Sequence, residues 1–125
     1  MELEKRQKVA DNYNKHLNQL NLGITTPILI YEATSSWAQY TIILPKDIDR
    51  DILQENLRSK NIPTAVYYPI PLNEHKPYEK YPVSHEGLSN TIYLSKNVLS
   101  LPMHPYLSES DIILIVKCIA QAIKN

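Results

Sequence analysis

Four histidines and one cysteine are among the side chains in this sequence that could bind a metal or take part in nucleophilic catalysis. They are His16, His75, His85, His104 and Cys118. No two histidines have the short spacing of zinc ligands, and there is no second cysteine to complete such a site. The sequence also lacks the Gly-x-Ser-x-Gly motif that presents the nucleophile in one large class of hydrolases. The pattern favours solvent-exposed side chains for His16, His75 and His85, and a small buried apolar role for Cys118 among its isoleucine neighbours.

Lys96 is a candidate for a lysine that forms a Schiff base with a cofactor. Such an amine must be held beside a cofactor whose phosphate and ring are also bound by the protein. Phosphate-binding loops rely on glycine for close backbone approach, and neither Gly23 nor Gly87, the two glycines of the chain, lies in such a loop. We therefore predict that Lys96 is an exposed residue leading into a strand, and that this chain alone builds no cofactor site.

Tyr67 and Tyr68 stand where a predicted strand ends, immediately before Pro69-Ile70-Pro71. Neighbouring residues of a strand point to opposite faces, so one tyrosine is expected to face inward and the other outward. The residue pattern by itself favours an aromatic core residue beside an exposed one. A pair of ligand contacts is the alternative interpretation.

Two helices are predicted in the first half of the chain. Residues 2–21 form a polar helix with a thin apolar stripe, which indicates a neighbour outside this chain, and Gly23 suits its end. Residues 49–60 form a second helix, with Asp49 as N-cap and Asn61 in the left-handed conformation that follows the C-terminus. The apolar stripe of the first helix consists of Ala10, Tyr13, Leu17 and Leu20, and the buried side of the second of Ile52, Leu53 and Leu57.

Three short strands and a last helix complete the predicted fold. The strands cover residues 37–44, 64–68 and 97–101, and residues 72–89 are expected to be mostly irregular, with one helical turn near Tyr78. Ser108 begins the last helix, with Asp111 at the spacing of a capping box. The predicted buried face of that helix consists of Ile112, Ile115, Val116, Ile119 and Ile123. The order of elements predicts a small α+β unit with a sheet of about three strands packed against helices.

The composition excludes several classes of partner. The chain has 125 residues, enough for one domain with a core of its own, and its thirteen basic residues balance thirteen acidic ones. A neutral chain lacks the basic face that a phosphate backbone or an anionic membrane surface requires, so we expect no nucleic-acid and no membrane partner. The apolar runs are too short to cross a bilayer. A single cysteine and no apolar leader at the first residues indicate the cytoplasm.

Three stretches of the sequence, taken together and in order, resemble a known enzyme family. They are residues 37–42 (WAQYTI), 64–72 (TAVYYPIPL) and 99–107 (LSLPMHPYL). In order and spacing they resemble the C-terminal region of the DegT/DnrJ/EryC1/StrS aminotransferases, and residues 5–10 (KRQKVA) are similar to that family's linker helix. The most similar branch aminates a UDP-linked 3-keto-hexuronic acid for surface polysaccharide. The resemblance divides the chain into a linker helix at residues 1–22 and a small domain at residues 23–125.

The resemblance implies a fold-type I enzyme that uses pyridoxal 5'-phosphate and is usually a homodimer. In such enzymes glutamate supplies the amino group and the ketone of a sugar nucleotide receives it. The Schiff-base lysine and the acid at the pyridine nitrogen belong to the large domain of the family, which no part of this sequence resembles. The chain alone is therefore expected to bind no cofactor and to be inactive.

The resemblance also assigns candidate substrate contacts. Tyr67 and Tyr68 occupy the position of an aromatic or histidine pair that precedes the Tyr-Pro-x-Pro turn, and His104 is a further candidate. Tyr67 and Asn73 depart from the family pattern, since histidine is common at both positions. Two other interpretations stay open: an interaction or dimerisation module that kept the fold without the chemistry, and a small enzyme with its own site.

Overall fold

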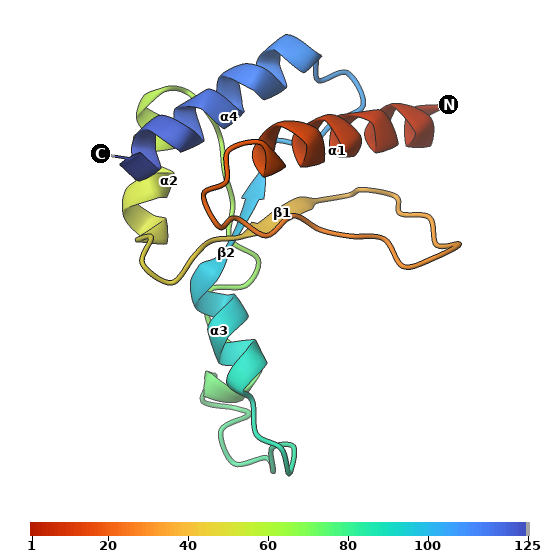
Figure 1. The fold of residues 1–125 in the computed structure, drawn as a ribbon. Helices are drawn as coiled ribbons and strands as arrows, with labels where there is room; N and C mark the ends of the chain where they lie inside the picture. The colour runs from red at the N-terminus through yellow and green to blue at the C-terminus, as the bar shows by residue number, and fades with distance from the viewer. Residues whose placement is uncertain (125) are drawn as a thin grey trace.

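The computed structural model describes residues 1–124 (Figure 1). Four α-helices, one short 3-10 helix and two strands follow one another along this part of the chain. In chain order they are α1 (Glu2–Asn18), β1 (Tyr40–Ile43), α2 (Arg50–Ser59), η1 (Leu72–Glu74), α3 (Ser89–Asn97), β2 (Val98–Leu101) and α4 (Glu109–Lys124). The fold is α+β, as predicted.

The sheet consists of β1 and β2, which pair antiparallel with Tyr40 opposite Leu101. Isolated bridges continue it on both sides, from Thr25 to Ile43 and from Ala65 to Ser100. The predicted strand at residues 64–68 is therefore wrong, because only Ala65 pairs with the sheet. The flanking Pro63 and Pro69 have no N–H to donate to a ladder, so only one pair of hydrogen bonds forms there.

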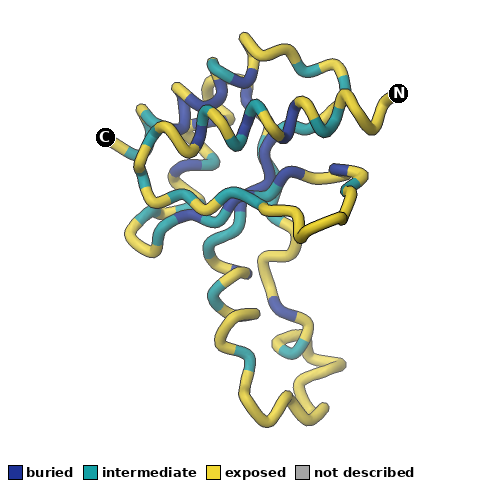
Figure 2. Tube along the Cα trace, turned by 45° about the vertical axis from the view of Figure 1, so that its right-hand side comes forward, coloured by how far each residue is buried: buried dark blue, intermediate teal, exposed yellow. Residues whose placement is uncertain are grey.

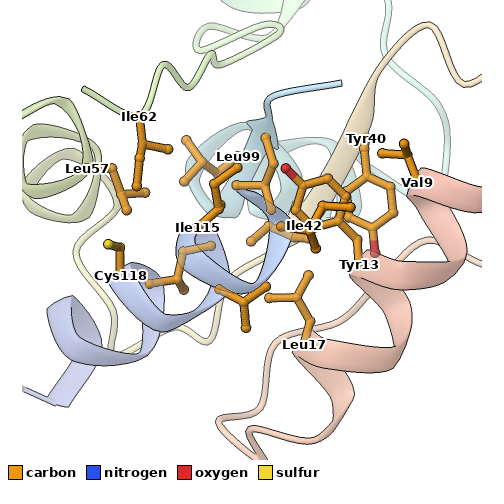
Figure 3. Close-up of a cluster of buried hydrophobic side chains, with 14 of the residues drawn as sticks. Val9, Tyr13, Leu17, Tyr40, Ile42, Leu57, Ile62, Leu99, Ile115 and Cys118 are labelled. Carbon is orange, nitrogen blue, oxygen red and sulfur yellow. The ribbon is translucent and has the colours of Figure 1, made fainter. Parts of the chain in front are cut away.

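One face of the sheet packs against the helices and forms the core (Figures 1 and 3). Side chains alternate across a strand, so Tyr40 and Ile42 of β1 point into this core while Thr41 points to the opposite face. Helix α4 packs against α1 and against α2, and its apolar residues contact the sheet from between them. The fully buried side chains of the core include Tyr13, Leu17, Tyr40, Ile42, Leu53, Leu57, Leu99, Ile112 and Ile119.

Helix α1 finds its apolar partner within this chain. Ala10, Tyr13 and Leu17 are buried as predicted, together with Val9, and they pack against α4 and the sheet. The expectation that this thin stripe needs a neighbour outside the chain is therefore wrong. The helix ends at Asn18, three residues before the predicted end, and the chain then turns through the left-handed residues Asn21 and Gly23.

Trp37 joins the start of β1 to helix α1. Its side chain is buried, and its indole N–H donates a hydrogen bond of 2.7 Å to Oε1 of Gln7. The guanidinium of Arg6 donates to the Trp37 carbonyl at 3.0 Å. Trp37 has a positive φ of 47°, which an extended strand does not allow, so the strand predicted from residue 37 begins only at Tyr40.

The predicted caps of helix α2 are confirmed. The carboxylate of Asp49 accepts hydrogen bonds from the backbone N–H groups of Asp51 and Ile52 at 2.9 and 3.0 Å. Asn61 follows the helix with a φ of 59°. Leu53 is buried as predicted, but Ile52 is 62% exposed and does not belong to the buried side.

Asp49→Ala should lower the free energy of unfolding by about 1 kcal/mol, because two N–H groups at the start of α2 lose their acceptor. Urea unfolding followed by circular dichroism measures this change. Asp47→Ala, in the exposed turn before the helix, is the matched control and should change the free energy by less than about 0.5 kcal/mol. Equal losses in both variants would contradict the cap.

The capping box of helix α4 is also confirmed. The backbone N–H of Asp111 donates to Oγ of Ser108 at 3.1 Å, and the backbone N–H of Ser108 donates to the Asp111 carboxylate at 3.3 Å. Because α1 and α2 flank this helix, most of its wide apolar surface is covered within the chain. Leu114 is the exception and is 58% exposed.

Glu109 at the start of α4 forms the exposed polar link to helix α1. Its carboxylate lies 3.2 Å from Nε2 of His16 and 3.4 Å from Nζ of Lys15. The hydrogen bond from His16, and then that from Lys15, lower the pKa of Glu109 below its ordinary value of 4.5. A lowered folded-state pKa means that the stabilisation is present above pH 4.5 and is lost as the pH falls below it.

We expect Glu109→Gln to remove this pH dependence. The unfolding midpoint of the unmodified chain should exceed that of the variant slightly at pH 6, and the two should converge toward pH 3. Thermal unfolding at several pH values measures the difference. Glu86→Gln, at an exposed acid far from α1, is the control. If the difference in unfolding midpoint between the unmodified chain and Glu109→Gln grew as the pH fell, the contact of Glu109 with His16 and Lys15 would not be stabilising.

Helix α3 was not predicted, because the sequence indicated only an irregular segment up to residue 89 and a strand from 97. Thr91, Ile92 and Tyr93 are weak helix formers, and the N-cap Leu88 has no side-chain oxygen to accept from the first N–H groups. Contacts from outside the helix compensate, since Arg50 of α2 donates to the Ser95 carbonyl. The expected helical turn near residue 78 is present only as hydrogen-bonded turns, and the short η1 helix precedes it.

Two segments project from the body of the molecule (Figures 1 and 2). We call residues 26–36 the finger and residues 68–97, which include η1 and α3, the arm. Both are mostly exposed, and the finger carries the strongly exposed apolar side chains Ile28, Ile30 and Tyr31. Within residues 1–124, no helix has the length and apolar character needed to cross a membrane.

Candidate functional site

A large cleft lies between the arm and the face of the sheet that is turned away from the core. It has a volume of about 600 Å³, and we call it the sheet cleft. Aliphatic and aromatic side chains dominate its lining. The lining residues are Thr41, Tyr67, Tyr68, Ile70, Pro71, Leu72, His75, Thr91, Leu94, Ser95 and Val98. Strands β1 and β2 and helix α3 thus position one side of the cleft, and the proline-rich segment positions the other.

Both tyrosines of the Tyr67–Tyr68 pair lie on this cleft. Tyr67 is 50% and Tyr68 80% exposed, so the expectation that one of them faces the core is wrong. Regular strand pairing ends at Ala65, and the alternation of a strand therefore does not extend to them. The half-buried Val66 packs against the core in their place. The peptide bond that joins the two tyrosines is cis.

The polar groups of the sheet cleft are hydroxyls and one imidazole. The hydroxyls of Thr41 and Ser100 bond each other at 2.7 Å, and Oγ of Ser95 donates to the Ile92 carbonyl, so these groups are already paired. The phenol hydroxyls and the side chains of Thr91 and His75 remain to meet a ligand. None of the lining residues named above is a carboxylate, a lysine or an arginine, so they can bind and orient a ring with hydroxyl groups. His75 is the lining side chain best suited to acid–base chemistry.

His104 lies outside the sheet cleft. Its side chain is exposed, and its Nδ1 accepts a hydrogen bond of 3.3 Å from the backbone N–H of Tyr106. A smaller hollow of about 250 Å³, on the other side of Tyr67, extends to Pro102 and Met103 but not to His104. The structure therefore brings Tyr67 and Tyr68 together and leaves His104 apart from them.

The structure adds Thr91, Leu94, Ser95 and Val98 to the residues considered from the sequence. All four line the sheet cleft, three of them from α3 and one from the start of β2. Their spacing of three, four and seven residues is that of one helix face, and this periodicity was the available signal. It was missed because the segment has weak helix propensity.

The ten lysines of the chain are all exposed. Lys96, the Schiff-base candidate, lies at the end of α3 beside a shallow hollow that it shares with Lys46 and the start of α2. The amine of Lys46 lies over the ring of Tyr93, 5.4 Å from its centroid. In residues 1–124, no three histidine, cysteine or acidic side chains lie close enough together to hold a metal ion. Cys118 is buried in α4, as predicted.

Known proteins of one aminotransferase family match nearly the whole of this chain. Residues 1–120 match the model of the DegT/DnrJ/EryC1/StrS aminotransferase family. A UDP-2-acetamido-2-deoxy-3-oxo-D-glucuronate aminotransferase of Pseudomonas aeruginosa is 37% identical over 128 residues, which cover 99% of this chain and 31% of that protein. A UDP-N-acetyl-3-dehydro-alpha-D-glucosamine 3-aminotransferase of Acidithiobacillus ferrooxidans is 33% identical over 86% of this chain and 27% of its own length.

A solved structure of an aminotransferase of this family shares the fold of this chain. The DegT DnrJ EryC1 StrS aminotransferase of Brucella abortus superimposes with a TM-score of 0.86 and 36% identity, over 98% of this chain and 31% of that one. The chain spans about a third of the length of the relatives that it matches. A family match over residues 1–120 and a shared fold agree with each other. The chain belongs to the DegT/DnrJ/EryC1/StrS aminotransferase family.

Proposed function

We propose that this chain is the C-terminal small domain of an aminotransferase that transfers an amino group from glutamate to a keto-sugar nucleotide for surface polysaccharide. The observation that carries the proposal is the pattern of coverage. Nearly all of this chain matches relatives named for amination of UDP-linked keto sugars, but it matches only 31% and 27% of their lengths. The chain then acts as one part of a larger, cytoplasmic and homodimeric enzyme whose large domain holds the cofactor.

The cofactor of that enzyme is pyridoxal 5'-phosphate, which supplies an electron sink for transamination when it is bound. The residues described here do not fit its covalent site. A Schiff-base lysine is commonly activated by desolvation in an apolar pocket, and every lysine of this chain is exposed. This supports a division of labour in which the chain contributes binding surface and the large domain contributes the chemistry.

In this proposal Tyr67 and Tyr68 contact the sugar of the nucleotide. Their rings can cover an apolar face of a pyranose, and their hydroxyls can bond its hydroxyl groups. His104 is a secondary candidate that would need a partner surface to meet the substrate. Residues 1–22 are assigned as the linker helix and residues 23–125 as the small domain, although Tyr13 and Leu17 dock the helix firmly on the core.

A second candidate function is an interaction or dimerisation module that retains the fold without catalysis. The exposed apolar side chains Ile28, Ile30 and Tyr31 of the finger favour it, because such a group on a projecting loop suits a protein interface. The two functions differ in whether the chain can complete an active site.

A chimeric enzyme tests the proposal. This chain replaces the matching 31% of the Pseudomonas aeruginosa relative, and transamination of the UDP-linked 3-keto sugar by glutamate is measured. We expect activity from the chimera, and neither activity nor an aldimine absorbance band from the isolated chain. A folded, cofactor-loaded but inactive chimera would favour the interaction module, and turnover by the isolated chain would overturn the proposal.

Removal of one phenol hydroxyl in the chimera tests the sugar contact. Tyr68→Phe should lower kcat/KM about two- to tenfold, the usual contribution of one neutral hydrogen bond. Tyr93→Phe, whose ring lies beneath Lys46 and does not line the sheet cleft, is the matched control and should leave kcat/KM unchanged. Equal values for the Tyr68→Phe chimera and the parent chimera would remove Tyr68 from the site.

A further inference from the structure

A second cleft, within the arm, opens directly onto the sheet cleft. It has a volume of about 420 Å³, and we call it the arm cleft. The two clefts share Leu72 and Thr91, so an elongated ligand can occupy both without leaving the protein surface. The residues that line the arm cleft are Leu72, Asn73, Tyr78, Tyr81, Pro82, Val83, Ser84, Leu88 and Thr91.

The arm cleft is built from aromatic rings that the arm itself does not bury. The rings of Tyr78 and Tyr81 lie with their centroids 6.2 Å apart and their planes tilted by 42°. Tyr78 is 45% and Tyr81 68% exposed, although both side chains have large apolar surfaces. At this separation no ring fits between them, so a planar ligand would stack on one ring and meet the edge of the other.

The polar groups of the arm cleft suit a neutral heterocycle. None of its lining residues is charged, which makes it a poor site for a phosphate. Asn73 is half-buried, and its amide carries an acceptor oxygen and two donor hydrogens. The imide edge of uracil presents an N–H donor beside a carbonyl acceptor, and one side-chain amide can meet both. Stacking on aromatic rings combined with bonding of a base edge is the usual way in which proteins bind an unpaired base.

We propose that the arm cleft binds the uracil base of the nucleotide carrier, while the sheet cleft holds the sugar. Tyr81 stacks on the base, Tyr78 meets the edge of the base, and Asn73 bonds its imide edge. The phosphates then lie at the open junction beside Thr91, the polar residue that both clefts share. This inference rests on the proposed function, because it divides the same ligand between two neighbouring clefts.

Titration of the 125-residue chain with uridine 5'-monophosphate, followed by NMR of the backbone amides, tests the inference. We expect saturable shifts in residues 72–91 and none from ribose 5-phosphate, which lacks the base. Tyr81→Leu should raise the Kd about 5- to 150-fold, the range observed when one stacked aromatic is lost, and Tyr81→Phe should change it less than about twofold. Because Tyr81 is exposed, these variants should keep the spectrum of the body unchanged.

Two further variants make the test specific. Asn73→Leu, which keeps the size of the side chain, should raise the Kd about two- to tenfold. Tyr31→Leu, at a tyrosine of the finger that is even more exposed than Tyr81, should not change it. Absence of saturable shifts in the arm, or an unchanged Kd in Tyr81→Leu, would overturn the assignment. If the chimera is active but the base does not bind as expected, the proposed function is supported and the assignment of the arm cleft is wrong. If uridine 5'-monophosphate binds as expected but the chimera is inactive, the assignment of the arm cleft is supported and the proposed function is not.

Discussion

Replacement of Tyr13 by alanine should lower the free energy of unfolding by about 3–5 kcal/mol, a large part of the 5–15 kcal/mol typical of a domain. Tyr13 is fully buried where α1 meets the sheet, and its ring stacks on Tyr40 with the centroids 4.7 Å apart. Its hydroxyl donates to the carbonyl of Pro102 at 2.9 Å. The substitution therefore leaves a cavity and removes the partner of a carbonyl on the segment that follows β2.

Two other variants separate these contributions. Tyr13→Phe keeps the ring and should cost about 1 kcal/mol through the lost hydrogen bond, and Tyr31→Ala, at a tyrosine that is 91% exposed, should cost less than about 0.5 kcal/mol. Chemical unfolding followed by circular dichroism measures all three. If Tyr13→Ala cost no more than Tyr31→Ala, helix α1 would not be docked in solution.

Alkaline pH offers an independent check on the same residue. Burial, more than the neighbouring Tyr40, raises the pKa of Tyr13 above its ordinary value of 10. A raised folded-state pKa means that the corresponding stabilisation is complete below pH 10 and is lost as the pH rises above it. The stability of Tyr13→Phe should accordingly fall less steeply between pH 10 and pH 11 than that of the unmodified chain.

Replacement of Arg50 by alanine should loosen the arm. The side chain of Arg50 is 13% exposed and donates to the Ser95 carbonyl, and this bond ties the start of α2 to α3. The nearby backbone bond from Leu44 to the Asn97 carbonyl, 2.8 Å long, is another link at this end of the arm. Loss of a hydrogen bond to a charged group costs about 1.5–3 kcal/mol, so amide hydrogens of α3 should exchange about 10- to 150-fold faster.

Hydrogen exchange followed by NMR or mass spectrometry measures this effect. Arg50→Lys keeps the charge but loses the planar guanidinium. The exchange rates of its α3 amides should lie between those of the alanine variant and of the unmodified chain. Arg58→Ala is the control on the same helix, since Arg58 forms only an exposed pair with Glu55 at 3.2 Å. Unchanged exchange in α3 of Arg50→Ala would show that the backbone bonds alone hold the arm.

Elements with strong local signals were predictable from the sequence. Helix α2 has Asp49 before it and Asn61 after it, and α4 begins with the pair Ser108 and Asp111. Both ends of α2 and the start of α4 were therefore predicted within one residue. These caps act through hydrogen bonds between residues close in the chain. Position on the helix does not by itself decide burial, as Ile52 shows: it lies on the solvent side because α4 covers only the opposite side of α2.

Elements that depend on distant contacts were not predictable. Helix α3 has poor intrinsic propensity and is held by Arg50, which is 45 residues away from Ser95 in the chain. The strand expected at residues 64–68 has the right composition, yet the prolines on either side restrict it to the single bridge at Ala65. These contacts between distant residues also form the clefts. The family resemblance pointed to Tyr67 and Tyr68, but the arm residues that line the clefts around them could not be predicted from the sequence.

The fluorescence of Trp37 can report whether helix α1 is packed on the rest of the chain. It is the only tryptophan of the sequence, and its indole is enclosed between the start of β1 and Gln7 of α1. Release of α1 from the body would expose this indole to water and shift its fluorescence emission to longer wavelength. A spectrum recorded without any label would therefore report how firmly the first helix is held, in the isolated chain and in any larger assembly that pulls on it.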